Sequence, residues 1–144
     1  MSAPDAELRR EIAGLSYLQQ QMEELLRQEE ILRANLEDIL RARETLEQAW
    51  KARAVVEVLA PTGAGGFVRA ELKDVDRVVF GIGGDVSVEL PIPAAIERLD
   101  ARGKAIQEVQ KALASRLAEM EASAQEQDRA IQALYEKSKG GKPE

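Results

Sequence analysis

The chain has 144 residues, of which 32% are charged and only 3% aromatic, a composition typical of long helices and poor material for a globular core. It contains no histidine and no cysteine, which excludes a disulfide framework, a thiolate nucleophile and the commonest metal ligands, so we expect no cofactor and no metal. A net charge of −6 argues against nucleic acid as a partner. Because there is also no long apolar run and no leader-like segment, we expect a soluble, cytoplasmic protein without a membrane partner.

Residues 5–52 carry a sustained apolar heptad pattern. Residues 2–5 have the features of a helix start, with a serine that can cap, an early proline and an acidic residue. Three further apolar residues, Ile12, Leu26 and Leu40, widen the stripe on one flank. The pattern predicts a coiled-coil helix rather than an ordinary surface helix. Its main series, at sevenfold spacing, consists of Leu18, Leu25, Leu32, Ile39 and Leu46.

Residues 54–90 read as two tandem β-hairpins. Apolar and polar residues alternate along the segments, so each strand has one face suited to burial. Glycines stand where each hairpin reverses, because tight turns need positive φ angles. These turn glycines are Gly63, Gly65, Gly66, Gly83 and Gly84.

Four short strands cannot cover their own apolar face, and their edges carry unpaired backbone groups. We expect the flanking helices to be occupied with their own apolar stripes, so the strands would be covered by copies of themselves or by a sister chain. The hairpins are therefore predicted to be an assembly module. The residues expected to form its sheet are Val56, Val58, Phe67, Val68, Leu72, Val78, Phe80, Val86 and Val88.

A second heptad pattern spans residues 93–138, followed by a polar tail at 139–144 that we expect to be flexible. Pro91 would end the last strand and Pro93 would suit a first helical turn. Only Gln127 interrupts the series that contains Leu113, Met120 and Leu134. Because the two heptad segments match in length, they predict one antiparallel helical hairpin with the β-hairpins at its closed end.

This pairing predicts a register and a site. Leu25 should lie near Met120 and Ile39 near Ile106, while Gly103 should fall opposite Arg43 and give its guanidinium room. The stripe stays apolar to the helix ends near the termini, where helices fray and cover each other least. These ends could bind exposed apolar segments of another protein, although the same residues could merely complete the seam. The candidate binding residues are Leu8, Ile12, Leu15, Ile131, Leu134 and Tyr135.

The order of a long helix, the segments 59–68, 79–84 and 88–89, and a second long helix resembles the alpha subunit of archaeal prefoldin. The run Gly63-Ala64-Gly65 before a Phe-Val strand is the most specific part of this resemblance. The resemblance implies a heterohexamer of two alpha and four beta subunits, whose hairpins form a β-barrel platform. It also implies an ATP-independent chaperone that captures unfolded proteins at coiled-coil tips and passes them to a group II chaperonin.

Other functions fit the sequence less well than a chaperone does. The glycine-rich segments 63–66 and 81–84 superficially suggest phosphate loops, but neither opens a helix. Carboxylates lie at helical i, i+4 spacing from basic residues, as with Glu37 and Arg41, which favours surface ion pairs over catalysis. No nucleophile and base can be assembled, so an enzyme is not expected. The open alternative is a structural coiled-coil scaffold or tether that binds no clients.

Overall fold

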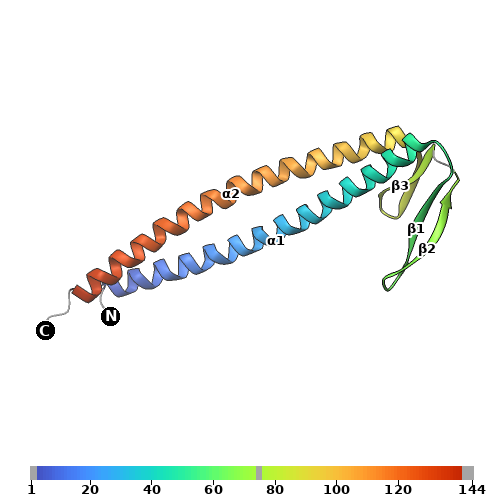
Figure 1. The fold of residues 1–144 in the computed structure, drawn as a ribbon. Coiled ribbons are helices and arrows are strands. Elements are labelled where there is room, and N and C mark those ends of the chain that lie inside the picture. The colour runs from blue at the N-terminus through green and yellow to red at the C-terminus, as the bar shows by residue number, and fades with distance from the viewer. Residues whose placement is uncertain (1–2, 74–75, 141–144) are drawn as a thin grey trace. The chain divides into compact units, whose positions relative to one another are not determined.

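The computed structural model describes residues 3–73 and 76–140. In chain order the elements are α1 (Ala3–Ala52), β1 (Val56–Gly63), β2 (Gly66–Leu72), β3 (Arg77–Gly83), β4 (Val86–Pro91) and α2 (Ile92–Gly140) (Figure 1). The predicted fold of two long helices and two antiparallel hairpins is confirmed. The chain forms two compact units, an outer unit of Met1–Arg33 with Glu108–Glu144 and a base unit of Ala34–Gln107.

Both helices are slightly longer than their heptad patterns predicted. α1 begins at Ala3, and α2 runs from Ile92 through Gly140, so the first two residues of the expected tail are helical. Lys137 and Lys139 lie in the last turn of α2, where cations interact favourably with the helix dipole. The predicted serine cap at residue 2, residues 74–75 of the link between the hairpins and residues 141–144 of the expected tail lie outside the described residues.

In the outer unit the two helices pack through a continuous apolar cluster. Ser138 Oγ donates a hydrogen bond of 3.0 Å to Asp5 Oδ1, so the start of α1 and the end of α2 lie side by side. Leu25 and Met120 belong to the same cluster, which confirms the predicted proximity of these two residues. The cluster consists of Leu25, Leu113, Leu117 and Met120, with Leu18, Met22 and Leu32 packed against it.

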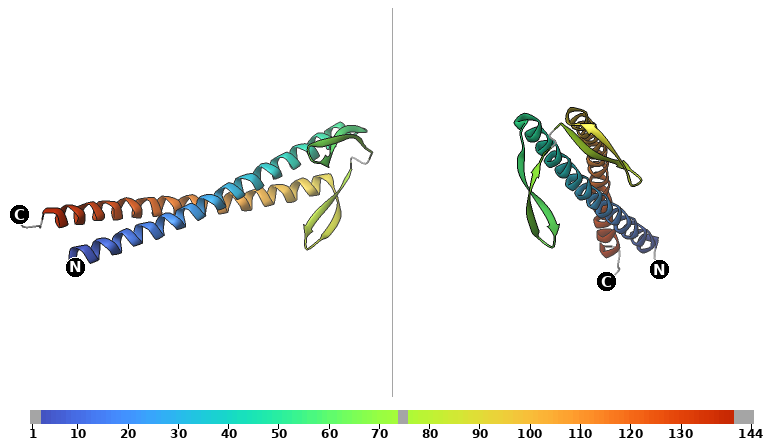
Figure 2. Two further views of the ribbon diagram at one scale, coloured as in Figure 1. Left: turned by 90° about the horizontal axis from the view of Figure 1, so that it is seen from below. Right: turned by 90° about the vertical axis from the view of Figure 1, so that its right-hand side faces the viewer.

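The base unit carries two separate two-stranded sheets, the first hairpin (β1–β2) and the second hairpin (β3–β4), which stand apart in Figure 2. Both are antiparallel. In the first hairpin Val58 pairs with Ala70, and in the second Phe80 pairs with Val88. Each ladder shifts register just before its turn, between Pro61 and Gly63 or between Gly81 and Gly83, so each strand bulges there.

The turns themselves require left-handed backbone at two central residues. In the first hairpin these are Ala64 (φ 50°) and Gly65 (φ 81°), and in the second Gly84 (φ 57°) and Asp85 (φ 60°). Two positive φ angles in a two-residue loop are the signature of a type I′ turn, whose twist matches that of the flanking strands. Ala64 adopts this conformation at a steric cost that glycine would not have.

The second hairpin packs on the helices of its own chain, which corrects an expectation drawn from the sequence. Phe80 is buried against Ala95 and Leu99 of α2, and Val78 and Leu90 pack on the same cluster together with Ile39 and Leu46 of α1. The prediction that the flanking helices were not available to cover the strands is therefore wrong for this hairpin. In the part of the chain that the structure describes, the cluster contains no residue of β1 or β2.

Gly103 and Arg43 line the same hollow between the helices, as predicted, but the nearest neighbours of the glycine are other residues. A Cβ at this position would lie 3.7 Å from Leu36 Cδ1 and 3.9 Å from Ile39 Cγ2, so the glycine faces two apolar side chains and not the guanidinium of Arg43. Arg43 instead reaches Asp100, about one helical turn away on α2.

Candidate functional site

A groove opens between the two helices near their ends in the outer unit. It has a volume of about 470 Å³, within the range in which a pocket can bury a substantial apolar group. α1 contributes one wall and α2 the other. The residues that line the groove are Leu8, Ile12, Arg129, Ile131, Gln132, Ala133, Tyr135 and Glu136.

Four of the six predicted tip residues line this groove. Ile12 is 50% exposed and Tyr135 is 56% exposed, while Leu8 and Ile131 are half-buried. The other two, Leu15 and Leu134, are half-buried but do not line it. The groove therefore presents apolar surface that the helix pair itself does not cover.

The rim of the groove carries both signs of charge. Arg129 and Glu136 line it directly, and a shallower polar depression beside it includes Glu11 and Glu126 together with Arg129. Such a mixed rim favours no polyanion and no polycation. The heptad pattern missed Arg129, Gln132, Ala133 and Glu136, whose only signal was that each lies within two residues of Ile131 or Tyr135 in the sequence.

The seam between the helices is interrupted just below the groove. A Cβ at Gly14 of α1 would lie 3.1 Å from Nε2 of Gln127 on α2, so the two residues face each other closely. Gln127 Oε1 is buried and, among the described residues, has no hydrogen-bond partner. A buried amide oxygen without a partner costs about 1–3 kcal/mol. The helices are therefore held together less firmly here than at the apolar cluster around Leu25.

The first hairpin has uncovered apolar side chains on both faces. Cross-strand partners share a face, so Val56, Val58, Val68 and Leu72 lie on one side, and Val68 is exposed. Phe67 pairs with Pro61 on the other side and is 61% exposed. Leu59, which was not among the predicted assembly residues, shares this second face.

The predicted assembly residues of the second hairpin divide into buried and exposed groups. Phe80 is buried, and Val78 and Val88 are half-buried. Val86 is exposed. Val79, which is 71% exposed, and Ile82 also remain open to solvent, although neither was predicted to take part. Uncovered apolar side chains on a short two-stranded sheet are typical of a surface that another chain covers.

Within residues 3–73 and 76–140, no group of three or more His, Cys, Asp or Glu side chains could hold a metal ion. Neither helix, over the same residues, has a stretch that is long and apolar enough to cross a bilayer. The exposed apolar side chains of the groove and of the hairpins are of the kind that burial against protein surface would stabilise.

Two long helices joined by two β-hairpins, with an apolar groove near the helix ends, define a coiled-coil protein of the helical-hairpin type. The prefoldin subunit family model matches residues 18–137, and the chain belongs to the prefoldin family. It is 36% identical over 109 residues to prefoldin subunit alpha of Methanothrix thermoacetophila, and the matched region covers 76% of this chain and 71% of that one. It is 31% identical over 137 residues to prefoldin subunit alpha of Pyrococcus horikoshii, which covers 92% and 93% of the two chains.

The fold is also similar to that of a solved structure. A chain in the cryo-EM structure of filamentous prefoldin from Methanocaldococcus jannaschii superposes with a TM-score of 0.65 at 20% sequence identity. The match covers 82% of this chain and 95% of that one. At this identity the likeness concerns the fold alone.

Proposed function

We propose that this protein is a subunit of an ATP-independent chaperone that captures unfolded proteins in the groove near its helix ends. The observation that carries the proposal is the groove itself, in which Leu8, Ile12, Ile131 and Tyr135 present apolar surface that the helix pair leaves open. Membership of the prefoldin family supports the same role. Capture needs no chemical step, so the proposal includes no catalysis and no cofactor.

The binding energy comes from burial of apolar surface. Each Å² of apolar area removed from water contributes about 25 cal/mol, before the costs of association. A single groove of this size binds weakly. Several subunits on one platform raise the effective concentration of each other's grooves, so weak contacts add up to retention of a client.

We propose that the hairpins provide this platform. The exposed apolar residues of the first hairpin, and Val79, Ile82 and Val86 of the second, would be covered by other prefoldin subunits. The resemblance to archaeal alpha subunits supports a complex of two alpha and four beta subunits that works in the cytoplasm. Within the same proposal, captured clients are handed to a group II chaperonin.

Point variants in the groove test client capture. We expect Ile12→Gln combined with Tyr135→Gln to weaken binding of an unfolded client about tenfold, since two partly exposed apolar side chains are replaced by good helix formers. The measurement is suppression of the aggregation of heat-unfolded citrate synthase by the assembled complex, as a function of complex concentration. Tyr17→Gln is the matched control, because Tyr17 is 63% exposed on α1 but does not line the groove.

The alternative function is a structural scaffold or tether that binds no clients. It predicts that the groove variants and the Tyr17 control suppress aggregation equally well, or that the wild-type complex suppresses none. Either result would contradict the chaperone proposal.

A further inference from the structure

The second hairpin is held on one face of the first turns of α2. Ala95, Leu99 and Arg102 are spaced at i, i+4 and i+7, so they lie along the same side of the helix. Ala95 is fully buried and Leu99 nearly so, and both pack against Phe80. This side of α2 therefore presents two apolar residues, Ala95 and Leu99, followed by the cation of Arg102.

Arg102 makes two different contacts with β3. Its guanidinium carbon lies 4.6 Å from the centre of the Phe80 ring, within the range of a cation–π interaction. Its Nη2 donates a hydrogen bond of 2.9 Å to the carbonyl oxygen of Gly81. One side chain of α2 thus contacts the ring of Phe80 and the backbone of the next residue, Gly81.

These contacts fall where the hairpin is least fixed by its own ladder. The register of β3 and β4 shifts between Gly81 and Gly83, and a β-bulge bends and twists the strand that carries it. A Cβ at Gly81 would meet no atom within 4 Å, so packing around this residue does not set the strand's direction. The hydrogen bond from Arg102 to Gly81 ties this part of the strand to the helix, beside the apolar contacts of Phe80.

Each hairpin has an arginine that pairs with the neighbouring strand. Arg69 Nε lies 3.8 Å from Glu57 Oε1 in the first hairpin, and Arg77 Nε lies 3.8 Å from Glu89 Oε1 in the second. In the region that the structure describes, however, the first hairpin adds no residue to the buried cluster of the base unit. The two hairpins therefore differ in how they are anchored.

We infer that Arg102 is a positioning residue that sets the orientation in which the second hairpin meets a partner subunit. The inference rests on the proposed assembly through the hairpins. Strand pairing requires aligned backbone groups, and an isolated two-stranded hairpin is only marginally stable. A hairpin that is fixed in direction before the encounter loses less conformational freedom on binding, which favours association.

The first test compares Arg102→Met, Arg102→Lys and Arg98→Met in the full chain. Hydrogen exchange is measured by mass spectrometry on peptides from residues 77–91, with peptides from residues 56–72 as the internal reference. We expect about tenfold faster exchange at 77–91 in Arg102→Met, from loss of the cation–π contact and the hydrogen bond. Arg102→Lys should fall between, since it keeps a cation, and Arg98→Met should match the wild type because Arg98 is exposed one turn earlier.

The second test measures assembly with a prefoldin beta subunit by mass photometry over a dilution series. Arg102→Met should weaken assembly about tenfold, with partial rescue in Arg102→Lys, while circular dichroism shows unchanged helix content. Faster exchange without weaker assembly would reduce Arg102 to a local stabilising contact and overturn the inference. Unchanged exchange would overturn it as well. If the wild type itself fails to assemble, the proposed platform fails and the inference fails with it.

Discussion

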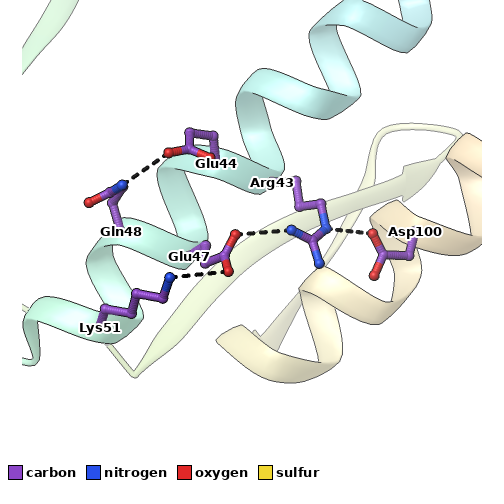
Figure 3. A network of polar contacts seen from close by, with 6 residues as sticks. All are labelled: Arg43, Glu44, Glu47, Gln48, Lys51 and Asp100. Atoms are coloured by element: carbon purple, nitrogen blue, oxygen red, sulfur yellow. Dashed lines mark hydrogen bonds and ion pairs between the residues drawn. The ribbon is translucent and has the colours of Figure 1, made fainter.

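Arg43 Nε donates a hydrogen bond of 2.6 Å to Asp100 Oδ1, and the same guanidinium donates through Nη1 to Glu47 Oε2 at 3.0 Å (Figure 3). The hydrogen bond and the charge of Asp100 raise the pKa of Arg43 above its ordinary value. Arg43 occupies a position of the apolar seam, so an ion pair is found where the heptad pattern predicts an apolar residue. Polar pairs at such positions are the best-attested devices for specifying register.

We expect Arg43 and Asp100 to be energetically coupled. The thermal unfolding midpoint should fall in Arg43→Met and in Asp100→Asn, and the double variant should be less destabilised than the sum of the two. The effect should shrink at high salt, because both side chains are partly exposed. Lys51→Met is the matched control, since Lys51 contacts Glu47 but no residue of α2 in the described ion pairs. Strict additivity at low salt would contradict the coupling.

Gly103→Ala should stabilise the protein by about 1 kcal/mol. Glycine in a helix interior is disfavoured by roughly this amount relative to alanine, and the new Cβ would make ordinary contacts with Leu36 and Ile39 at 3.7 and 3.9 Å. Gly14→Ala is the comparison, because its Cβ would lie only 3.1 Å from Gln127 and force that side chain to move. Urea unfolding followed by circular dichroism at matched concentration gives both values. A loss of stability in Gly103→Ala would contradict the prediction, because it would mean that the new Cβ clashes with Leu36 or Ile39.

Gln127→Leu should tighten the outer unit. It removes a buried amide oxygen, whose lack of a hydrogen-bond partner destabilises the folded state by about 1–3 kcal/mol. It also restores the sevenfold apolar series. We expect slower hydrogen exchange in residues 3–33 and 108–140, with the base unit unchanged.

The same variant bears on client capture. Firmer packing beneath the groove should reduce its ability to adapt to clients, so aggregation suppression should weaken even though stability rises. If stability rises and suppression is unaffected, the loose packing at Gln127 has no part in binding.

Val68→Asp tests the first hairpin as an assembly surface. Val68 is exposed in the single chain, so the substitution should barely alter its stability. Burial of the carboxylate against a partner would be costly, and the complex with a beta subunit should become smaller by light scattering. Arg69→Asp, on the opposite face of the same strand, is the comparison. Normal assembly of Val68→Asp would exclude this face from the interface.

A pH effect follows from the pair of Glu24 and Arg27. The hydrogen bond from Arg27 lowers the pKa of Glu24 below its ordinary value of 4.5. A lowered pKa in the folded state means that the pair contributes stability above pH 4.5 and loses it as the pH falls through the folded value. The effect should be small because both side chains are exposed. The thermal unfolding midpoint should therefore fall slightly less steeply with decreasing pH in Glu24→Gln than in the wild type.

The local elements of this protein follow from its sequence alone. A sevenfold apolar repeat fits only a helix that packs on another helix, and strict alternation with glycine turns fits only hairpins. The proximity of Leu25 and Met120 followed as well, because two seams of equal length joined at one end have one simple pairing. Membership of a family was indicated by the order of these segments.

Only the tertiary structure decided what covers each apolar face. Both hairpins alternate in the same way, yet Phe80 is buried on α2 while Val68, on the apolar face of the first hairpin, stays exposed. The groove could be anticipated through Ile12 and Tyr135, but not through Arg129 or Glu136, which belong to the polar side of the pattern. Periodicity determines which side of an element is apolar, because it depends on local geometry. The neighbour that meets this side depends on contacts between residues far apart in the chain, which no local pattern contains.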